Sequence, residues 1–178
     1  TTPFTEEMSR KLKAGDSVLI TGTIISARDA AHKAMTEALA KGEPLPVDWH
    51  DQIVYYLGPT PAKPGDPIGS AGPTTSGRMD AYTPTMLAQG IKGMVGKGSR
   101  SPEVVEAMKK HGVTYFAAVG GAAARIAESG KKYEVVGYPE LGPEAVAKLT
   151  VEDFPCIVVI DSEGNNFYEM GQKPYRKL

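Results

Sequence analysis

Short apolar segments rich in β-branched residues alternate along the 178-residue chain with segments whose apolar residues recur at helical spacing. This alternation is typical of an α/β fold, in which helices cover a sheet. The expected strands are residues 17–25, 53–57, 93–97, 113–119, 133–137, 156–161 and 166–170. The expected helices are residues 5–13, 27–41, 101–111, 121–129 and 143–149, with a further helical pattern after residue 78. No repeat or interdomain linker is visible, so we expect a single domain over residues 1–178.

Two local signals sharpen this expectation. Ser101, Pro102 and Gly112 frame one helix, because a hydroxyl caps its start, proline takes its first position and glycine ends it. Gly22 interrupts the first expected strand, which indicates a bulge or a close approach of two backbones.

The segment from Gly58 to Gly77 is the most unusual part of the chain. It holds five prolines and five glycines, which exclude a helix or an interior strand. A loop of this length inside a compact domain is usually either functional or disordered. Because helical spacing resumes directly after it, the functional interpretation is favoured.

Three basic residues lie at positions where a positive charge does not stabilise the expected fold. Arg28 lies in the first turn of an expected helix, where the helix dipole disfavours a positive charge. Arg78 follows a glycine at another loop-to-helix junction, and Lys97 lies between two glycines after a strand. Ligands of α/β sheets bind at such junctions, and each arginine can hold a carboxylate through two hydrogen bonds. The pattern therefore predicts a site for an anion with two charged ends; the alternative is three solvated surface cations.

Hydroxyl and imidazole groups lie next to these cations. Thr74, Thr75 and Ser76 precede Gly77 and Arg78, so they either cap the next helix or offer donors to the ligand of Arg78. His32 lies one turn beyond Arg28 on the same helix face. It either orients Arg28 or the substrate, or is a buried structural histidine.

Composition excludes several other classes of function. The net charge of −1 lacks the basic excess of a nucleic-acid-binding protein. The longest apolar stretches are far shorter than the roughly 18 residues of a membrane span, and the first residues do not form a secretory signal. Cys156 is the only cysteine and is expected in the core, since it can form neither a disulfide nor a metal cage alone. We therefore expect a cytoplasmic protein.

Many short motifs, in order, resemble the C-terminal domain, or separate β subunit, of iron–sulfur-dependent class I fumarases and the related L(+)-tartrate dehydratases. The most specific are ARDAAH at residues 27–32 and GPTTSGRMD at residues 72–80. Gly96-Lys97-Gly98 and Val151-Glu152-Asp153-Phe154-Pro155 also match, and the matching pieces cover roughly residues 10–170.

The resemblance implies a swivelling β/β/α-type domain with a mixed sheet, which closes over a [4Fe–4S] cluster. In such enzymes the open iron of the cluster acts as a Lewis acid on the substrate hydroxyl. Mapped onto matching positions, Arg28, Arg78 and Lys97 would bind the substrate carboxylates. Thr74 would be the base that handles the carbon-bound proton, with Thr75 as its competitor. A cluster needs several cysteine thiolates, so it must come from a partner α subunit.

The implied function is that of the β subunit of a two-component hydro-lyase that interconverts fumarate and (S)-malate. Such a subunit would act in a hetero-oligomer, for example α2β2. The nearest alternative is the β subunit of an L(+)-tartrate dehydratase. A further alternative is a non-catalytic module for dicarboxylate binding or assembly.

Overall fold

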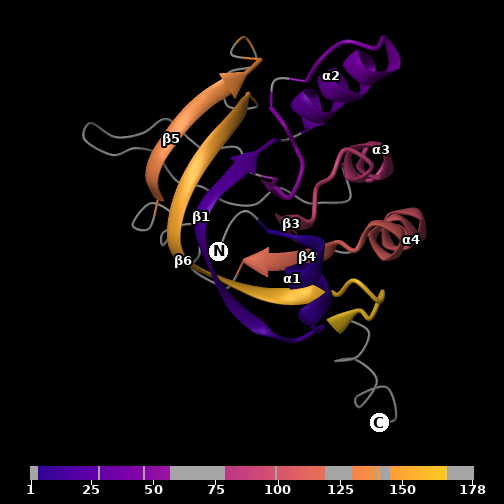
Figure 1. Ribbon diagram of the computed structural model, residues 1–178, viewed down its shortest axis with the longest axis vertical. Coiled ribbons are helices and arrows are strands. Elements are labelled where there is room, and N and C mark those ends of the chain that lie inside the picture. Colours follow the sequence, from indigo (N-terminus) through magenta and orange to yellow (C-terminus); the bar gives the residue numbers. More distant parts are fainter. Residues whose placement is uncertain are drawn as a thin grey trace.

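A computed structural model describes residues 4–27, 29–45, 47–56, 79–98, 100–118, 130–138, 140 and 145–167. Its strands surround a common centre, and three of its helices lie along one side (Figure 1). The strands are β1 (Ser17–Ser26), β2 (Ile53–Tyr55), β3 (Gly93–Gly96), β4 (Thr114–Ala118), β5 (Gly130–Gly137) and β6 (Val146–Ile160). The helices are α1 (Glu6–Lys11), α2 (Asp29–Ala40), α3 (Thr83–Leu87) and α4 (Pro102–His111).

The sheet is mixed and closes into a small barrel, which confirms the predicted class. β1, β2, β3 and β4 are parallel neighbours, and β6 pairs antiparallel with both β4 and β1. Five strands thus form a closed ring, while β5 adds to the first half of β6. The long β6 makes this possible, because its second half carries the pairing with β4.

Alternating side chains divide the apolar residues between two cores. Side chains that point into the ring form the barrel interior: Phe4, Ile20, Ile24, Ile53, Tyr55, Val95, Phe116, Leu149, Val151, Phe154, Cys156 and Val158. Side chains on the opposite face pack under α2, α3 and α4 and form the outer core, which includes Val54, Met94 and Tyr115 from the sheet. Successive strand residues point to opposite faces, so β2, β3 and β4 are buried on both sides.

Local signals in the sequence are realised as predicted. The Ser101 side chain caps α4 by accepting from the Val104 N–H, and Gly112 ends the helix with a φ of 68°. The predicted irregularity at Gly22 is a shift in the register of β1 against β6. Opposite it, Asp153 has a φ of 52° and donates its backbone N–H to the Thr21 hydroxyl at 3.0 Å. The two strands bend together here, as ring closure requires.

One predicted helix is wrong, since residues 146–149 of the expected helix 143–149 belong to β6. Val146 and Leu149 have helical spacing, but pairing with β1 on one side and β5 on the other outweighs this local preference. The expected strand 166–170 is reduced to one bridge between Ile160 and Asn166, and Phe167 is helical. The expected helix 121–129 and the Gly58–Gly77 loop lie outside the described residues.

Candidate functional site

Two of the residues predicted for the site lie near the carboxyl ends of the parallel strands. Lys97 directly follows β3, and its side chain is exposed. His32 lies in α2 with 1% of its surface exposed, and its ring meets the Tyr56 ring edge-on at 5.5 Å. Four other predicted site residues lie outside the described part of the chain: Arg28, Thr74, Thr75 and Arg78.

Two described residues that border the undescribed stretches, Ala27 and Tyr56, are held at neighbouring strands. Ala27 precedes Arg28 and donates its N–H to the Tyr55 carbonyl at 3.0 Å. Tyr56, the last described residue before the 57–78 segment, donates its N–H to the Val95 carbonyl at 3.0 Å. The chain therefore enters these stretches from adjacent strand ends, next to Lys97, as a common site requires.

A buried arginine lies beneath this edge of the sheet. The side chain of Arg100 is 0% exposed, and its Nε donates to Asp80 Oδ1 at 2.7 Å. Its Nη2 donates to the Thr83 hydroxyl at 2.8 Å and its Nη1 to the Tyr56 hydroxyl at 3.1 Å. The guanidinium also lies 5.1 Å from the ring centres of Tyr56 and Tyr115. We call these five residues the Arg100 cluster.

The electrostatics of the Arg100 cluster keep the arginine charged. Burial alone would lower the pKa of the Arg100 guanidinium, but Tyr56 and Asp80 more than offset burial and hold this pKa above its ordinary value. The second oxygen of Asp80 accepts the backbone N–H of Ser101 at 2.8 Å, at the start of α4. A carboxylate is favoured there by the helix dipole.

Neither Arg100 nor Asp80 was among the residues predicted for the site from the sequence. A signal was present, since Arg100 directly precedes the Ser101-Pro102 helix start, where a cation is disfavoured. The same reasoning had selected Arg28. Asp80 closes the GPTTSGRMD motif, but nothing in the sequence pairs it with Arg100.

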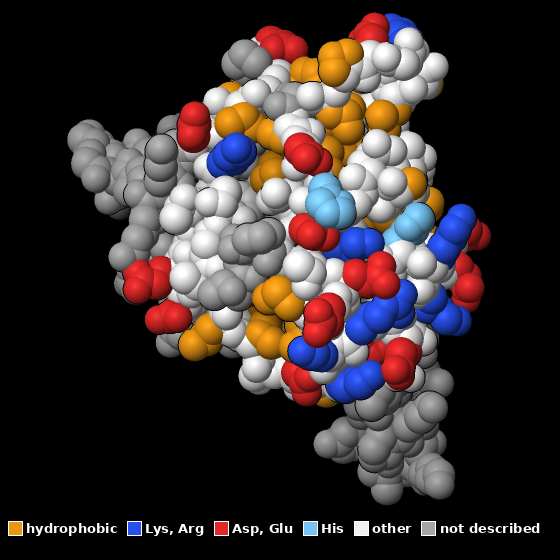
Figure 2. Space-filling view, in the orientation of Figure 1, with side chains coloured by type: hydrophobic (Ala, Val, Ile, Leu, Met, Phe, Trp, Pro, Cys, Tyr) orange, Lys and Arg blue, Asp and Glu red, His pale blue; other side chains and the backbone are white. Residues whose placement is uncertain are grey.

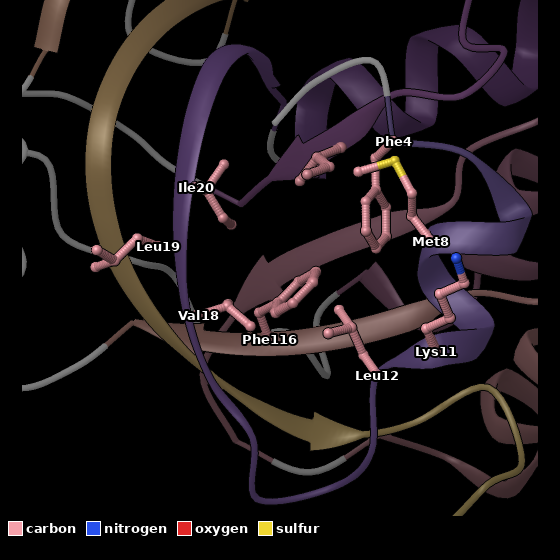
Figure 3. Close-up of a pocket in the computed structure, with 9 residues that line it drawn as sticks. Phe4, Met8, Lys11, Leu12, Val18, Leu19, Ile20 and Phe116 are labelled. Atoms are coloured by element: carbon pink, nitrogen blue, oxygen red, sulfur yellow. The ribbon is translucent and has the colours of Figure 1, made fainter.

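An apolar pocket among the described residues lies elsewhere. It has a volume of about 300 Å³ and opens beside α1, near the amino ends of β1 and β2. Figure 3 shows Phe4, Met8, Leu12 and Phe116 grouped around it, while Leu19 points away. Such an apolar lining offers no partner for two carboxylates, and the ammonium of Lys11 on its rim pairs with Glu7 at 3.4 Å.

Charged side chains of both signs are mixed on one face of the described residues. On the face shown in Figure 2, lysine and arginine side chains are interspersed with acidic ones instead of forming one basic patch. Ion pairs such as Arg10 with Glu6 and Lys13 with Glu163 contribute to this mixture. No helix of the described residues is long and apolar enough to cross a membrane.

The described residues do not fit an iron–sulfur cluster. No group of three or more histidine, cysteine, aspartate or glutamate residues among them could hold a metal ion. Cys156 is 1% exposed in the barrel interior, and burial raises the pKa of its thiol to about 12. The prediction that Cys156 is a core residue is confirmed. A cluster needs several accessible thiolates, which this side chain cannot supply.

Comparison with known proteins decides the family. Residues 1–171 match the protein family described as Fumarase C-terminus. The chain belongs to this family. The resemblance based on the ARDAAH and GPTTSGRMD motifs is thereby confirmed.

Relatives within and around the family differ in length. The chain is 46% identical over 155 residues to the aerobic class I fumarate hydratase of Escherichia coli, covering 86% of this chain and 28% of that protein. It is 45% identical over 152 residues to the mitochondrial fumarate hydratase 1 of Leishmania major, again covering 28% of that protein. A putative L(+)-tartrate dehydratase subunit beta of Methanocaldococcus jannaschii is 42% identical over 182 residues, covering 98% of this chain and 93% of that protein. The chain thus spans under a third of these fumarate hydratases, but nearly all of that subunit.

Proposed function

We propose that the chain is the β subunit of a two-component class I hydro-lyase that reversibly hydrates fumarate to (S)-malate. The observation that carries this proposal is the pair of matches described above. The chain is close in sequence to part of several fumarate hydratases, and it covers 93% of a relative named as a putative subunit beta. The missing portion of the enzyme would be a partner α subunit, which would also hold the [4Fe–4S] cluster.

The proposed substrate site consists of Arg28, Arg78 and Lys97, which bind the two carboxylates, with Thr74 as the base. Thr75 is the competitor for that role, and His32 would support Arg28 from the next turn of α2. The proposal is supported by the hydrogen bonds that bring Ala27 and Tyr56 to adjacent strand ends beside Lys97.

The chemistry explains why cations and a hydroxyl belong together. Removing a proton next to a carboxylate builds negative charge on that carboxylate, which fixed cations stabilise in the transition state. A threonine hydroxyl is a poor base in water. Thr74 would therefore need the nearby positive charges and a site closed to solvent, where electrostatic interactions are stronger.

An L(+)-tartrate dehydratase is the second candidate, because the relative of matching length carries that name. It would use the same cations on a substrate with one more hydroxyl. A non-catalytic dicarboxylate-binding or assembly module is the remaining alternative. The cytoplasmic location, the single domain over residues 1–178 and a hetero-oligomer such as α2β2 stay predictions.

Reconstitution tests these candidates directly. The chain is co-expressed with a cysteine-bearing α-type protein, the cluster is rebuilt without oxygen, and turnover of fumarate, malate and tartrate is measured. Hydration of fumarate is the expected result. Turnover of tartrate alone would select the second candidate, and no turnover with a fully loaded cluster would favour the binding module.

Within the active complex, Arg78→Ala should lower kcat/KM for fumarate by roughly 10²–10³-fold, the usual loss for one transition-state donor. Arg10→Ala is the matched control, because Arg10 is an exposed arginine on α1 paired with Glu6. That variant should keep the activity of the parent chain. Circular dichroism of both variants separates the two possible roles, since loss of folding in Arg78→Ala would make Arg78 structural.

A further inference from the structure

We propose that Arg100 and Asp80 form the positioning element of the substrate site, fixing Lys97 relative to the chain on both sides of the 57–78 segment. The proposal rests on the proposed function and adds two residues to it: Arg100, which lies outside the quoted motifs, and Asp80, the last residue of GPTTSGRMD, for which the motif gave no role. Arg100 and Asp80 are positioning residues here, since their side chains act through neighbouring groups and not on the substrate.

Stability alone is a weak reason for this ion pair. The side chains of Arg100 and Asp80 are 0% and 18% exposed, so both charges have lost most of their water. Buried pairs of this kind can often be replaced by apolar residues without loss of stability. In six other ion pairs among the described residues, at least one partner is 45% or more exposed. The pair of Arg100 and Asp80 is more deeply buried than any of these six.

The donors of Arg100 reach both sides of the 57–78 segment. Tyr56, which accepts from Nη1, is the last described residue before that segment. Asp80, which accepts from Nε, lies two residues after Arg78, and Thr83, which accepts from Nη2, begins α3. A guanidinium is planar and its donors point in fixed directions. One side chain therefore binds both the residue that follows β2 and the residues that begin the next described stretch.

A second set of contacts connects Arg100 to Lys97. The Tyr115 ring lies beside the guanidinium, and its hydroxyl donates to the Gly98 carbonyl at 2.9 Å. Gly98 follows Lys97 and has a φ of 86°, which favours glycine. Asp80 also accepts the Ser101 N–H and so fixes the chain on the other side of Arg100. A continuous path of buried and partly buried contacts thus runs from Gly98, next to Lys97, to Asp80, two positions beyond Arg78.

The same path extends toward the third proposed cation. The His32 ring packs edge-on against Tyr56. His32 lies in the first turn of α2, and this helix begins directly after Arg28. A movement of Tyr56 would therefore displace His32 and, with it, the start of α2. Three cations that bind one small substrate must keep fixed distances, and a displacement of about 1 Å can cost roughly a hundredfold in rate.

The test compares Asp80→Asn with Thr114→Val in the reconstituted complex. Asp80→Asn keeps the shape of the side chain but removes its charge and one acceptor. Thr114→Val removes another buried hydrogen bond, that between the Thr114 and Ser9 hydroxyls at 2.6 Å. It is a matched control, because Thr114 begins β4 and lies at the opposite end of the parallel strands from Lys97.

For Asp80→Asn we expect KM for fumarate to rise roughly tenfold and kcat to fall roughly tenfold. The resulting loss in kcat/KM is roughly a hundredfold, as expected when a binding group is misplaced by about 1 Å. A purely structural defect reduces the amount of folded enzyme, which lowers the apparent kcat and leaves KM unchanged. Thr114→Val should show only that pattern. An unchanged KM in Asp80→Asn would overturn the proposal.

Hydrogen exchange gives a readout that does not depend on turnover. In Asp80→Asn, but not in Thr114→Val, hydrogen exchange at the Ser101 amide should become at least tenfold faster. In the unsubstituted chain this amide donates a hydrogen bond to the Asp80 carboxylate. Unchanged protection there would also overturn the positioning role. If the unsubstituted complex turns over neither fumarate nor tartrate, the proposed function fails, and this exchange measurement still decides whether Asp80 fixes the chain.

Discussion

The barrel interior and the outer core are both closely packed, yet they differ in chemistry. The barrel interior is built from apolar and aromatic side chains and the neutral thiol of Cys156, and the buried hydroxyl of Thr114, on the same face of β4 as Phe116, bonds that of Ser9. The outer core surrounds a buried arginine, its aspartate partner and a buried histidine. Tyr55 and Tyr56 are consecutive on the chain but belong one to each core. The end of β2 and the residue after it thus supply an apolar contact on one face and a hydrogen-bond acceptor on the other.

The difference indicates that the two faces of one sheet have different roles. Apolar burial in the ring supplies stability without requiring any specific partner, since the hydrophobic effect is not directional. Charged groups in the outer core are costly to bury but define distances and directions. The charged groups lie at the carboxyl ends of the parallel strands, the usual place for ligands in α/β sheets.

The largest effect should follow from opening a void in the barrel interior. Phe154 is 0% exposed and packs against Tyr55 with ring centres 5.7 Å apart. Phe154→Ala should lower the free energy of unfolding by about 3–5 kcal/mol, because it removes apolar contact and leaves a cavity. Urea unfolding of the two chains measures this difference.

Leu19→Ala is the control on the same sheet, since Leu19 is 61% exposed. Its free energy of unfolding should change by less than about 0.5 kcal/mol. A loss below about 1 kcal/mol for Phe154→Ala would mean that the ring is not the main source of stability, and the contrast between the two cores would fail.

Much of the fold could be predicted because its signals are local. The Ser101-Pro102 start and the Gly112 end of α4 depend on residues within one helix, and they lie where the sequence placed them. Gly22 marked the irregularity in β1 for the same reason. The alternation of strands and helices gave the class, since each element carries its own period.

What could not be predicted depends on partners that are distant in sequence. Leu149 pairs with Ile24 and Tyr133, and this pairing makes a strand where the local spacing favours a helix. Ring closure by β6 and the contact of Arg100 with Asp80 are equally long-range. Of the candidate site, Lys97 and His32 lie at the expected edge, while roles for Arg28, Thr74, Thr75 and Arg78 remain predictions.

A smaller effect should follow from removing one acceptor in the outer core. Tyr56→Phe keeps the ring but deletes the hydroxyl that accepts from Arg100 at 3.1 Å. A charged donor then loses a buried partner, which should lower the free energy of unfolding by about 1–3 kcal/mol. Urea unfolding provides the measurement.

A double-mutant cycle with Thr83→Val sharpens this prediction, because Thr83 accepts from the same guanidinium at 2.8 Å. Groups that share one partner usually show coupling energies of about 0.5–3 kcal/mol. Strictly additive losses would show that the residues of the Arg100 cluster are not energetically coupled. The two cores would then differ only in which side chains they contain.

The smallest effect concerns pH, and it distinguishes the two cores by their titratable groups. Burial raises the pKa of the Cys156 thiol to about 12, so the barrel interior does not titrate between pH 5 and 8. His111 ends α4 beside the outer core. Burial first, and then Lys110 and Lys92, lower the pKa of its imidazole, although Glu6 opposes them.

A lowered pKa in the folded state means that the unfolded chain binds the His111 proton more readily. Stability should therefore fall as the pH decreases through the ordinary histidine pKa of about 6.5 and toward the lower folded value. Glu6 does not confuse this window, because its pKa is lowered from 4.5 and it stays charged. His111→Gln should flatten the change in urea midpoint between pH 7.5 and 5.5. If the urea midpoint changes equally with pH in both chains, the group that titrates is not His111. The proton responsible would then be bound at another residue.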